Sequence, residues 1–425
     1  MLVDDDKDDK ADRMEILLHG FDTHDTHHAI HAYDSDASGA FYMGEGVFLH
    51  SQVETPYGPQ RGVDGCFYRF DPKSFRLERY TETDYANPWG YTHDDWNQGF
   101  ISDASNGQNW WALPISGKMP HGSKVPKTAE FAPKRARPTS GNGFVSSRHF
   151  PDEYQGRFLL NNSIGFLGTS MHEIWEDESG FSGKHIGDLV SSTDPNVRIV
   201  DLEFGPDGSL FLVDWHNALV GHMQHNTRDP NRDHSHGRVY RVTYPSRPLV
   251  TPSKIAGASV EELLEILKVP EYRTRYRARR ELRGHKAEEV LPAVRKWVSG
   301  LDKADPLYEH SLCEALWATW AQNKVDADLL NAVLNAKQHQ ARAAGVNVIR
   351  HEFRDIPNSE ALLMKAANDE HGRVRLEAIV AASWMDSEAG ARIALEALKK
   401  PLDKWMGKVT EAILKKTLND DIDAL

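Results

Sequence analysis

Five histidines stand close together near the start of the chain, in the stretch HGFDTHDTHHAIHAYDSDASGAFYMGEGVF. These histidines are His19, His24, His27, His28 and His31. They precede a predicted hairpin whose second strand covers residues 40–43. Imidazoles at this density bind metal ions or transfer protons near neutral pH. Each one also fits the simpler role of a hydrogen-bonded histidine at a strand end. The stretch is therefore a candidate proton-transfer or metal site, with a structural role as the alternative.

A second candidate lies at the N-terminus, in DDDKDDKADRME, residues 4–15. Its acids fall on positions 1, 3, 5, 9 and 12 of an EF-hand-type calcium loop, and they are Asp4, Asp6, Asp8, Asp12 and Glu15. Position 6, where the loop needs glycine for its sharp turn, holds Asp9, and only three residues precede the loop. The pattern predicts an isolated calcium loop and not a complete EF-hand. A solvated acidic terminus is the alternative.

Two loop-rich segments carry the residue types of a ligand pocket. Residues 85–114 mix tryptophans with amides and carboxylates, and such mixtures line sugar or flat-cofactor pockets as well as β-domain cores. Residues 214–237 form a long loop between two predicted strands, and long loops inside compact domains usually have a function. The pocket candidates in these segments are Asn87, Trp89, His222, Arg228, Asp229, Arg232, His234 and His236.

Composition excludes several functions. The net charge of −13 argues against a nucleic-acid partner, because binding phosphates needs a basic surface. Cys66 and Cys313 fall in different predicted domains and no CxxCH string is present, so we expect neither a disulfide nor covalently attached haem. No apolar run approaches the ~18–20 residues of a membrane span, and the first residues do not resemble a signal peptide. Composition alone does not give the compartment.

The elements that position these residues change character near residue 250. Before it, short β-prone runs are separated by turn motifs. The clearest pair is 201–204 and 209–213, joined by Gly205-Pro206-Asp207-Gly208 and followed by a strand at 238–242. Strand pairs recur about every 40–60 residues, which is typical of the blades of a β-propeller. With about four blades encoded, we expect a mainly β, partial propeller that lacks the N-terminal blades of a larger ring.

After residue 250 the sequence becomes helical. Ser259 and Glu262 form a predicted capping box. A basic residue or histidine, followed by small and apolar residues, recurs at spacings of 33, 32, 33 and 33, at Arg277, His310, Arg342, Arg375 and Lys408. Five phased copies predict an all-α HEAT-like solenoid. The predicted division is an acidic calcium-type loop at 1–15, the partial propeller at 16–246, a linker at 247–258 and the solenoid at 259–425.

Specific strings in the first part resemble a known family: DTHHAI (25–30), HSQVETPYGP (50–59), ANPWG (86–90), SSRHFP (146–151), FGPDGSLFLVDW (204–215) and RDPNRDHSHGR (228–238). They are similar to the membrane-bound dehydrogenase domains of planctomycete-type bacteria, relatives of the PQQ-dependent soluble sugar dehydrogenases. In that family a propeller precedes HEAT-like repeats and often a c-type cytochrome. The resemblance covers nearly all of residues 4–244 and implies a periplasmic or cell-envelope location.

The resemblance implies roles for individual residues. His28 matches the histidine that takes the substrate hydroxyl proton while hydride passes to the quinone. Such a base needs a partner that orients its ring, and a carboxylate such as Asp25 or Asp229 is the candidate. Asn87 and Arg198 match residues that hold PQQ. Two cations expected to face the PQQ carboxylates are absent from their positions, and the candidates to replace them are Arg148, Arg228 and Arg232.

Two functions stay open at this point. The first is a quinoprotein-like oxidoreductase that acts on the CHOH group of sugars or other alcohols, with PQQ and calcium as cofactors. Because the chain has no CxxCH string, its electrons would pass to a separate acceptor such as a cytochrome c. The second is a non-catalytic extracytoplasmic module that binds polysaccharide, or a protein partner through the solenoid. Either way, we expect His28, Asn87 and Arg198 to meet the 214–237 loop, together with His27, Trp89 and the other pocket candidates.

Overall fold

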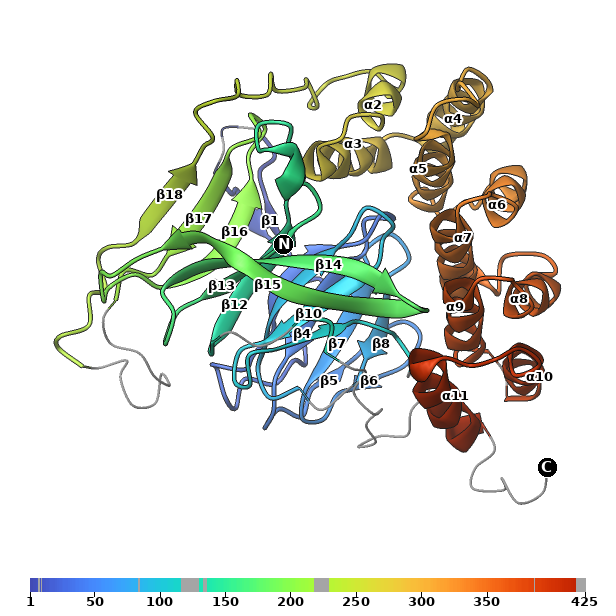
Figure 1. Ribbon diagram of the computed structural model, residues 1–425, viewed down its shortest axis with the longest axis horizontal. Coiled ribbons are helices and arrows are strands. Elements are labelled where there is room, and N and C mark those ends of the chain that lie inside the picture. The colour runs from blue at the N-terminus through green and yellow to red at the C-terminus, as the bar shows by residue number, and fades with distance from the viewer. Residues whose placement is uncertain are drawn as a thin grey trace.

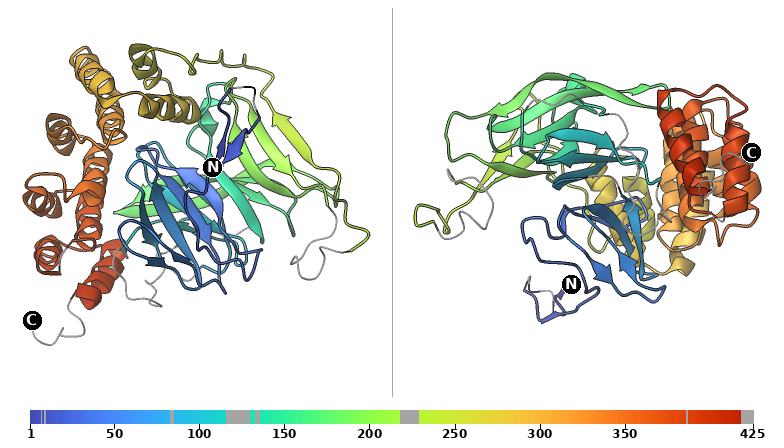
Figure 2. Two further views of the ribbon diagram at one scale, coloured as in Figure 1. Left: turned by 180° about the vertical axis from the view of Figure 1, so that it is seen from behind. Right: turned by 90° about the horizontal axis from the view of Figure 1, so that it is seen from below.

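The computed structural model describes residues 1–6, 8, 10–82, 85–115, 130–132, 136–217, 229–385 and 387–417. Figure 1 shows a β part beside a column of helices. The last strand ends at Val242 and the helices run from Val260 to Thr417. The views from behind and from below show that the helices form one row along one side of the β part (Figure 2). None of the described helices is long and apolar enough to cross a membrane.

Four antiparallel sheets follow one another along the chain, and the described residues form no closed barrel. The first has the order β3-β4-β7-β8 and the second β11-β10-β9, while the third and fourth run in chain order. Their strands are β3 (His31–Ser35), β4 (Phe41–Glu45), β7 (Cys66–Asp71), β8 (Arg76–Thr81), β9 (Pro88–His93), β10 (Gly99–Asp103), β11 (Gln108–Trp111), β12 (Thr139–Phe144), β13 (Phe158–Asn162), β14 (Gly168–Asp177), β15 (Gly180–Ser191), β16 (Ile199–Phe204), β17 (Leu210–Asp214) and β18 (Arg238–Val242). Two short ribbons, β1 (Leu2–Val3) with β2 (Arg13–Met14) and β5 (Gln52–Val53) with β6 (Gln60–Arg61), accompany them.

The fourth sheet confirms the hairpin predicted from sequence. Phe204 pairs with Leu210 across the turn, where the Gly205 amide donates to the Ser209 carbonyl at 2.8 Å. Gly208 has a φ of +78°, a conformation that glycine adopts without a steric penalty. The strand predicted at 238–242 is β18, whose residue Val242 pairs with Leu210. Turn chemistry and alternating burial therefore fix the register of this sheet.

The described residues include ten helices in the C-terminal region. They are α2 (Val260–Ile266), α3 (Tyr272–Gly284), α4 (Ala287–Ser299), α5 (Tyr308–Trp320), α6 (Ala327–Leu334), α7 (His339–Glu352), α8 (Ser359–Ala367), α9 (Gly372–Ala382), α10 (Ser387–Ala397) and α11 (Lys404–Thr417). The capping box of Ser259 and Glu262 is present at the start of α2. In Figure 1, α5, α7 and α9 stack beside the sheets, and α4, α6, α8 and α10 lie on the outer side. The five recurring sequence segments fall on α3, α5, α7, α9 and α11.

A buried arginine repeats in this helical region. Arg275 Nη1 donates to the carbonyls of Val269 and Pro270, six and five residues earlier. Arg342 does the same with the carbonyls of Ala336 and Lys337, at 2.9 Å each, and Arg375 with those of Asp369 and Glu370. Each guanidinium thereby ties its helix to the preceding turn. The first copy of the predicted repeat must be moved from Arg277 to Arg275, because Arg277 donates to the Phe204 carbonyl of β16 instead.

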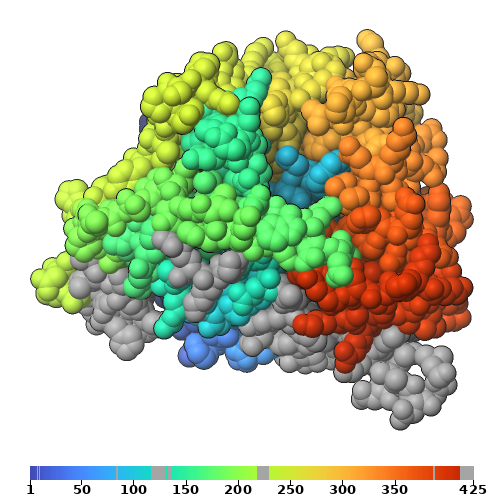
Figure 3. Space-filling model, viewed as in Figure 1, coloured from blue at the N-terminus to red at the C-terminus, as the bar shows by residue number. Residues whose placement is uncertain are grey.

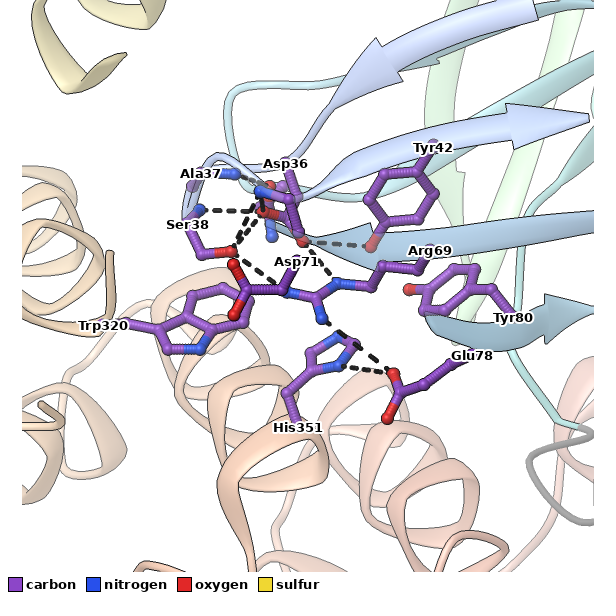
Figure 4. A network of polar contacts seen from close by, with 12 residues as sticks. Asp36, Ala37, Ser38, Tyr42, Arg69, Asp71, Glu78, Tyr80, Trp320 and His351 are labelled. Carbon is purple, nitrogen blue, oxygen red and sulfur yellow. Dashed lines mark hydrogen bonds and ion pairs between the residues drawn. The ribbon is translucent and has the colours of Figure 1, made fainter. Parts of the chain in front are cut away.

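The β part and the helices share their main core and a network of buried charges. One hydrophobic cluster contains Phe100, Trp111 and Phe181 together with the apolar faces of the helices. In Figure 4, Arg69 of β7 binds Asp36 at 2.8 Å, and its guanidinium lies over the Trp320 ring. The His351 ring of α7 stacks on Trp320, with ring centroids 5.3 Å apart. Burial and the nearby guanidiniums keep the pKa of His351 well below its usual value. The two parts are therefore joined through polar as well as apolar contacts.

Candidate functional site

The turn just before β3 brings three chemically active side chains together. The His28 amide donates to the Asp25 carbonyl at 3.1 Å, and the His27 amide donates to Asp25 Oδ1 at 3.0 Å. Ligand atoms of Asp25, His27 and His28 all lie within 4.8 Å of one another. Two imidazoles and one carboxylate form a donor set that suits a divalent transition metal, and they also suit proton transfer. The local sequence DTHH builds this cluster because a carboxylate that accepts nearby amides closes a tight turn.

His28 is the most buried histidine of the cluster, with 3% of its surface exposed. Its Nδ1 lies 3.0 Å from the Val47 carbonyl and 3.8 Å from Asp25 Oδ2. A carbonyl only accepts, so Nδ1 carries the proton and Nε2 keeps its lone pair. The ring also stacks on Phe48, with centroids 5.7 Å apart. His28 is thus held in the tautomer that a general base or a metal ligand requires.

Gly46 directly follows β4 and lets the backbone pass close to the His28 ring. A Cβ at position 46 would lie 2.8 Å from the Ala86 carbonyl oxygen and 3.0 Å from His28 Cγ. The Gly46 amide donates to the His28 carbonyl at 3.0 Å, and this bond ties the turn to the end of β4. A side chain at this position would displace the imidazole, so the geometry of the turn depends on a glycine here.

Asn87, the predicted cofactor contact, lies beside the same cluster. Asn87 Nδ2 is 3.3 Å from His27 Nε2, and 4% of the residue is exposed. The backbone amides of Ala86 and Asn87 both donate to Asp103 Oδ2, at 2.8 and 3.1 Å. Asp103 is fully buried at the end of β10 and fixes the start of β9. Asp103 supports the site, and its place in the tryptophan-rich segment 85–114 was the one sequence signal that pointed to it.

A pair of tryptophans continues from this cluster toward the fourth sheet. The rings of Trp89 and Trp215 lie 5.3 Å apart, and Trp215 is 51% exposed. The Trp215 amide donates to the Arg198 carbonyl, and the Arg198 amide donates to Asp214 Oδ1 at 2.7 Å. Arg198 Nη1 donates to the Val197 carbonyl, and burial lowers the pKa of the guanidinium. A chain of contacts therefore runs from His27 through Asn87 to the beginning of the 214–237 loop.

The other predicted pocket residues contact α3 or residues of their own segment, are exposed, or lie outside the described residues. Arg148 forms a two-pronged ion pair with Glu271 at the start of α3, with distances of 2.8 and 3.0 Å. His234 and His236 are exposed, and His236 Nδ1 is 2.8 Å from Asp233. Asp229 and Arg232 belong to one turn, in which the Arg232 amide donates to the Asp229 carbonyl at 3.0 Å. His222 and Arg228 lie outside the described residues.

The N-terminal acidic loop is closed by the β1–β2 ribbon, in which Val3 pairs with Arg13. Ligand atoms of Asp4, Asp6 and Asp8 lie within 4.8 Å of one another on the surface. The other two predicted calcium ligands do not belong to this group: Asp12 Oδ2 accepts the Asp5 amide at 2.8 Å, and Glu15 forms an ion pair with Arg13. Three of the five predicted ligands thus come together, and calcium binding stays a prediction.

Comparisons with known proteins identify a family for the first part of the chain. The model of the family described as a domain of unknown function, DUF7133, matches residues 1–246. The chain therefore belongs to the DUF7133 family. A search of curated proteins found no match. Among solved structures, a glucose dehydrogenase is similar at 16% identity over 51% of this chain and 61% of that chain, with a TM-score of 0.32. The match spans less than two thirds of that protein, and its TM-score is too low to establish a shared fold.

Proposed function

We propose that the DUF7133 domain of this chain is a partial β-propeller of about four blades, followed by a HEAT-like solenoid. The four consecutive antiparallel sheets support the first assignment, because each would be one blade. The arginine anchor that recurs on α3, α7 and α9 supports the second. The family resemblance adds a periplasmic or cell-envelope location to this proposal.

Within this fold, the proposed activity is oxidation of the CHOH group of a sugar or another alcohol, with His28 as the base. The observation that carries it is the Nδ1 contact with the Val47 carbonyl, which holds the ring in the tautomer whose basic nitrogen is Nε2. Asp25 stands 3.8 Å from the same ring nitrogen and stabilises the imidazolium that forms. Asn87, next to His27, supplies an amide to position the substrate or cofactor.

PQQ fits the described residues poorly. An anionic quinone needs guanidinium or ammonium groups opposite its carboxylates. Arg198 stands beside Asp214 and donates to a backbone carbonyl, and Arg148 is held by Glu271. Arg228 lies outside the described residues. The oxidation therefore needs an added two-electron acceptor, a soluble quinone or dye, which takes the hydride from the carbon while His28 takes the hydroxyl proton. In this proposal the electrons finally reach a separate protein such as a cytochrome c.

A second candidate function is a binding module without catalysis. The observation that favours it is the contact of the exposed Trp215 ring with the half-buried Trp89, since accessible tryptophan rings beside polar groups stack on sugar rings. In this role the β part holds polysaccharide and the row of helices presents a surface to a protein partner. The cluster of Asp25, His27 and His28 would then be a structural or metal-binding turn.

The test uses the purified full chain with PQQ and calcium added, a panel of sugars and alcohols, and a dye as electron acceptor. Turnover that falls on the order of 10²- to 10⁴-fold in His28→Ala, with an unchanged melting temperature, supports the base role. His24→Ala is the matched control, because His24 is an exposed histidine in the same segment. No turnover and no quinone absorbance would favour the binding module. A stoichiometric metal that is lost in His28→Ala would overturn the base role.

A further inference from the structure

A cavity of about 490 Å³ lies between the β part and the helices, away from His28. The β9–β10 turn, β12, β14, β15 and β16 form one side of it, and α3 and α7 form the other. In Figure 3 a hollow with blue atoms of the first part of the chain at its floor is framed by green strands and orange helices. No residue of the turn 25–28 lines this cavity. It is therefore separate from the site of the proposed function.

Aromatic rings provide much of the wall. Phe100 and Phe181 are buried, and Trp175 is 44% exposed at the β14–β15 hairpin. Trp96, in the β9–β10 turn, lies edge-on to His310 of α5 with ring centroids 5.1 Å apart. Aromatic faces around a water-accessible cavity attract flat apolar groups and organic cations.

A buried acceptor on this wall lacks a donor. Asn142 is 7% exposed, and its Nδ2 donates to Ser102 Oγ at 2.8 Å. Its Oδ1 is buried and has no hydrogen-bond partner among the described residues. The Oδ1 atom has almost no accessible surface, so a ligand O–H or N–H donor satisfies it once the amide turns toward the cavity.

The carboxylates on the wall differ in whether a cation balances them. Glu203 binds Arg273 at 2.8 Å, and Glu176 binds His339 of α7 at 2.7 Å. Asp94 Oδ1 accepts the amides of Trp96 and Gln98, at 2.9 and 2.8 Å. Among the described residues, no lysine, arginine or histidine forms an ion pair with Asp94.

Burial therefore raises the pKa of Asp94 to about 7, with the charge of Asp95 adding to the effect and that of Arg373 opposing it. The carboxyl is partly protonated at neutral pH because its charge lacks a close counter-ion. A cation placed beside it would favour the ionised form.

We propose that this cavity binds a small organic amine that also carries hydroxyl or N–H donors, with its ammonium on Asp94, a donor on Asn142 and its carbon skeleton against Trp96 and Trp175. The lining is rich in acceptors and rings, and the one guanidinium among its residues, Arg273, is already bound to Glu203. An anion would meet the carboxylates of Asp94, Asp95, Glu176 and Glu203, so the site selects against it. A ligand here contacts both the sheets and the helices.

The test is titration of the full chain with glucosamine and spermidine, and with glucose as the uncharged counterpart of glucosamine, followed by calorimetry and tryptophan fluorescence. We expect saturable 1:1 binding of at least one amine, with glucose at least tenfold weaker. Asp94→Asn should weaken amine binding on the order of tenfold or more, because a charge-assisted contact becomes a neutral one. Glu288→Gln, an exposed acid on α4, is the matched control and should leave binding unchanged.

Two further measurements, a pH dependence and a tryptophan variant, test the amine site. Spermidine affinity should rise between pH 6 and pH 8 as Asp94 ionises, because its amines stay largely protonated over this range, and the rise should disappear in Asp94→Asn. Trp175→Ala removes a half-exposed ring and should weaken binding severalfold even if Asp94→Asn fails to fold. Equal binding of glucose and glucosamine would overturn the proposal in favour of a neutral polyol site. Saturation by neither amine, or unchanged binding in both variants, would overturn it as well.

Discussion

Arginines make different kinds of contact in the helical part and in the β part of the molecule. In the helices, Arg275, Arg342 and Arg375 repeat one set of contacts, each closing the turn before its own helix. In the β part, Arg69 and Arg198 have contacts that occur once, in the junction with the helices and beside the 214–237 loop. A buried polar group that recurs with the repeat period serves the scaffold. One that does not recur is where a junction or a functional site should be sought.

Removing a buried acid of the helical part should have the largest effect. Glu314 is fully buried and accepts from Arg275 Nε at 3.0 Å and from Arg279 Nη1 at 2.8 and 2.9 Å. Glu314→Leu removes the carboxylate that balances two buried guanidiniums, so it should cost about 3–5 kcal/mol of unfolding free energy. Urea denaturation measures this, with Glu288→Leu on the surface as control. A loss below about 1 kcal/mol would show that the helices do not depend on this pair.

Removing one repeated arginine should cost less. Arg342→Met loses the two carbonyl contacts and the two-pronged ion pair with Asp369, so we expect about 2–3 kcal/mol. Arg342→Lys should fail to restore stability, because an ammonium cannot reproduce the planar fork. Arg354→Met, which follows the end of α7, is the control. If Lys serves as well as Arg, the repeat requires only a positive charge.

The sequence predicted the parts of this structure that depend on neighbouring residues. The Gly205–Gly208 hairpin, the strand 238–242 and the Ser259–Glu262 capping box follow from local chemistry, and all three are present. The period of the helical repeat was also readable. Its phase in the first copy was wrong because Arg275 and Arg277 stand in one run of arginines, and only their carbonyl partners distinguish them.

At the candidate site, too, contacts between residues close in the sequence were predictable, and contacts between distant residues were not. His28 and Asp25 were predicted as partners, and the turn brings them to 3.8 Å because they are three residues apart. The Val47 carbonyl that holds the ring could not be predicted, since every residue has a carbonyl. The cavity between sheets and helices was also missed, because Asn142 and Asp94 come from separate sheets and gain meaning only when α3 and α7 cover them.

The smallest expected effect is a pH dependence at the junction of the two parts. The pKa of His351 in the folded chain is far below that in the unfolded chain, because of burial first and of Arg69 second. Below about pH 6.5 the unfolded chain gains a proton that the folded chain refuses, so stability falls as the pH falls. His351→Gln should reduce this slope by at most about 1.4 kcal/mol per pH unit. Parallel slopes for both proteins, measured by urea denaturation between pH 5 and 7, would contradict it.

The junction in Figure 4 also affects when the sheets can complete their folding during translation. Tyr80 receives a hydrogen bond from Arg350, which is synthesised 270 residues later. At about 5–20 residues per second, the sheets wait roughly 15–50 s for the helices that cover their charged edge. We expect the charges of Asp36, Arg69 and Glu78 to keep this surface hydrated during that interval. A wholly apolar junction of the same size would expose the nascent chain to aggregation before its partner helices emerged.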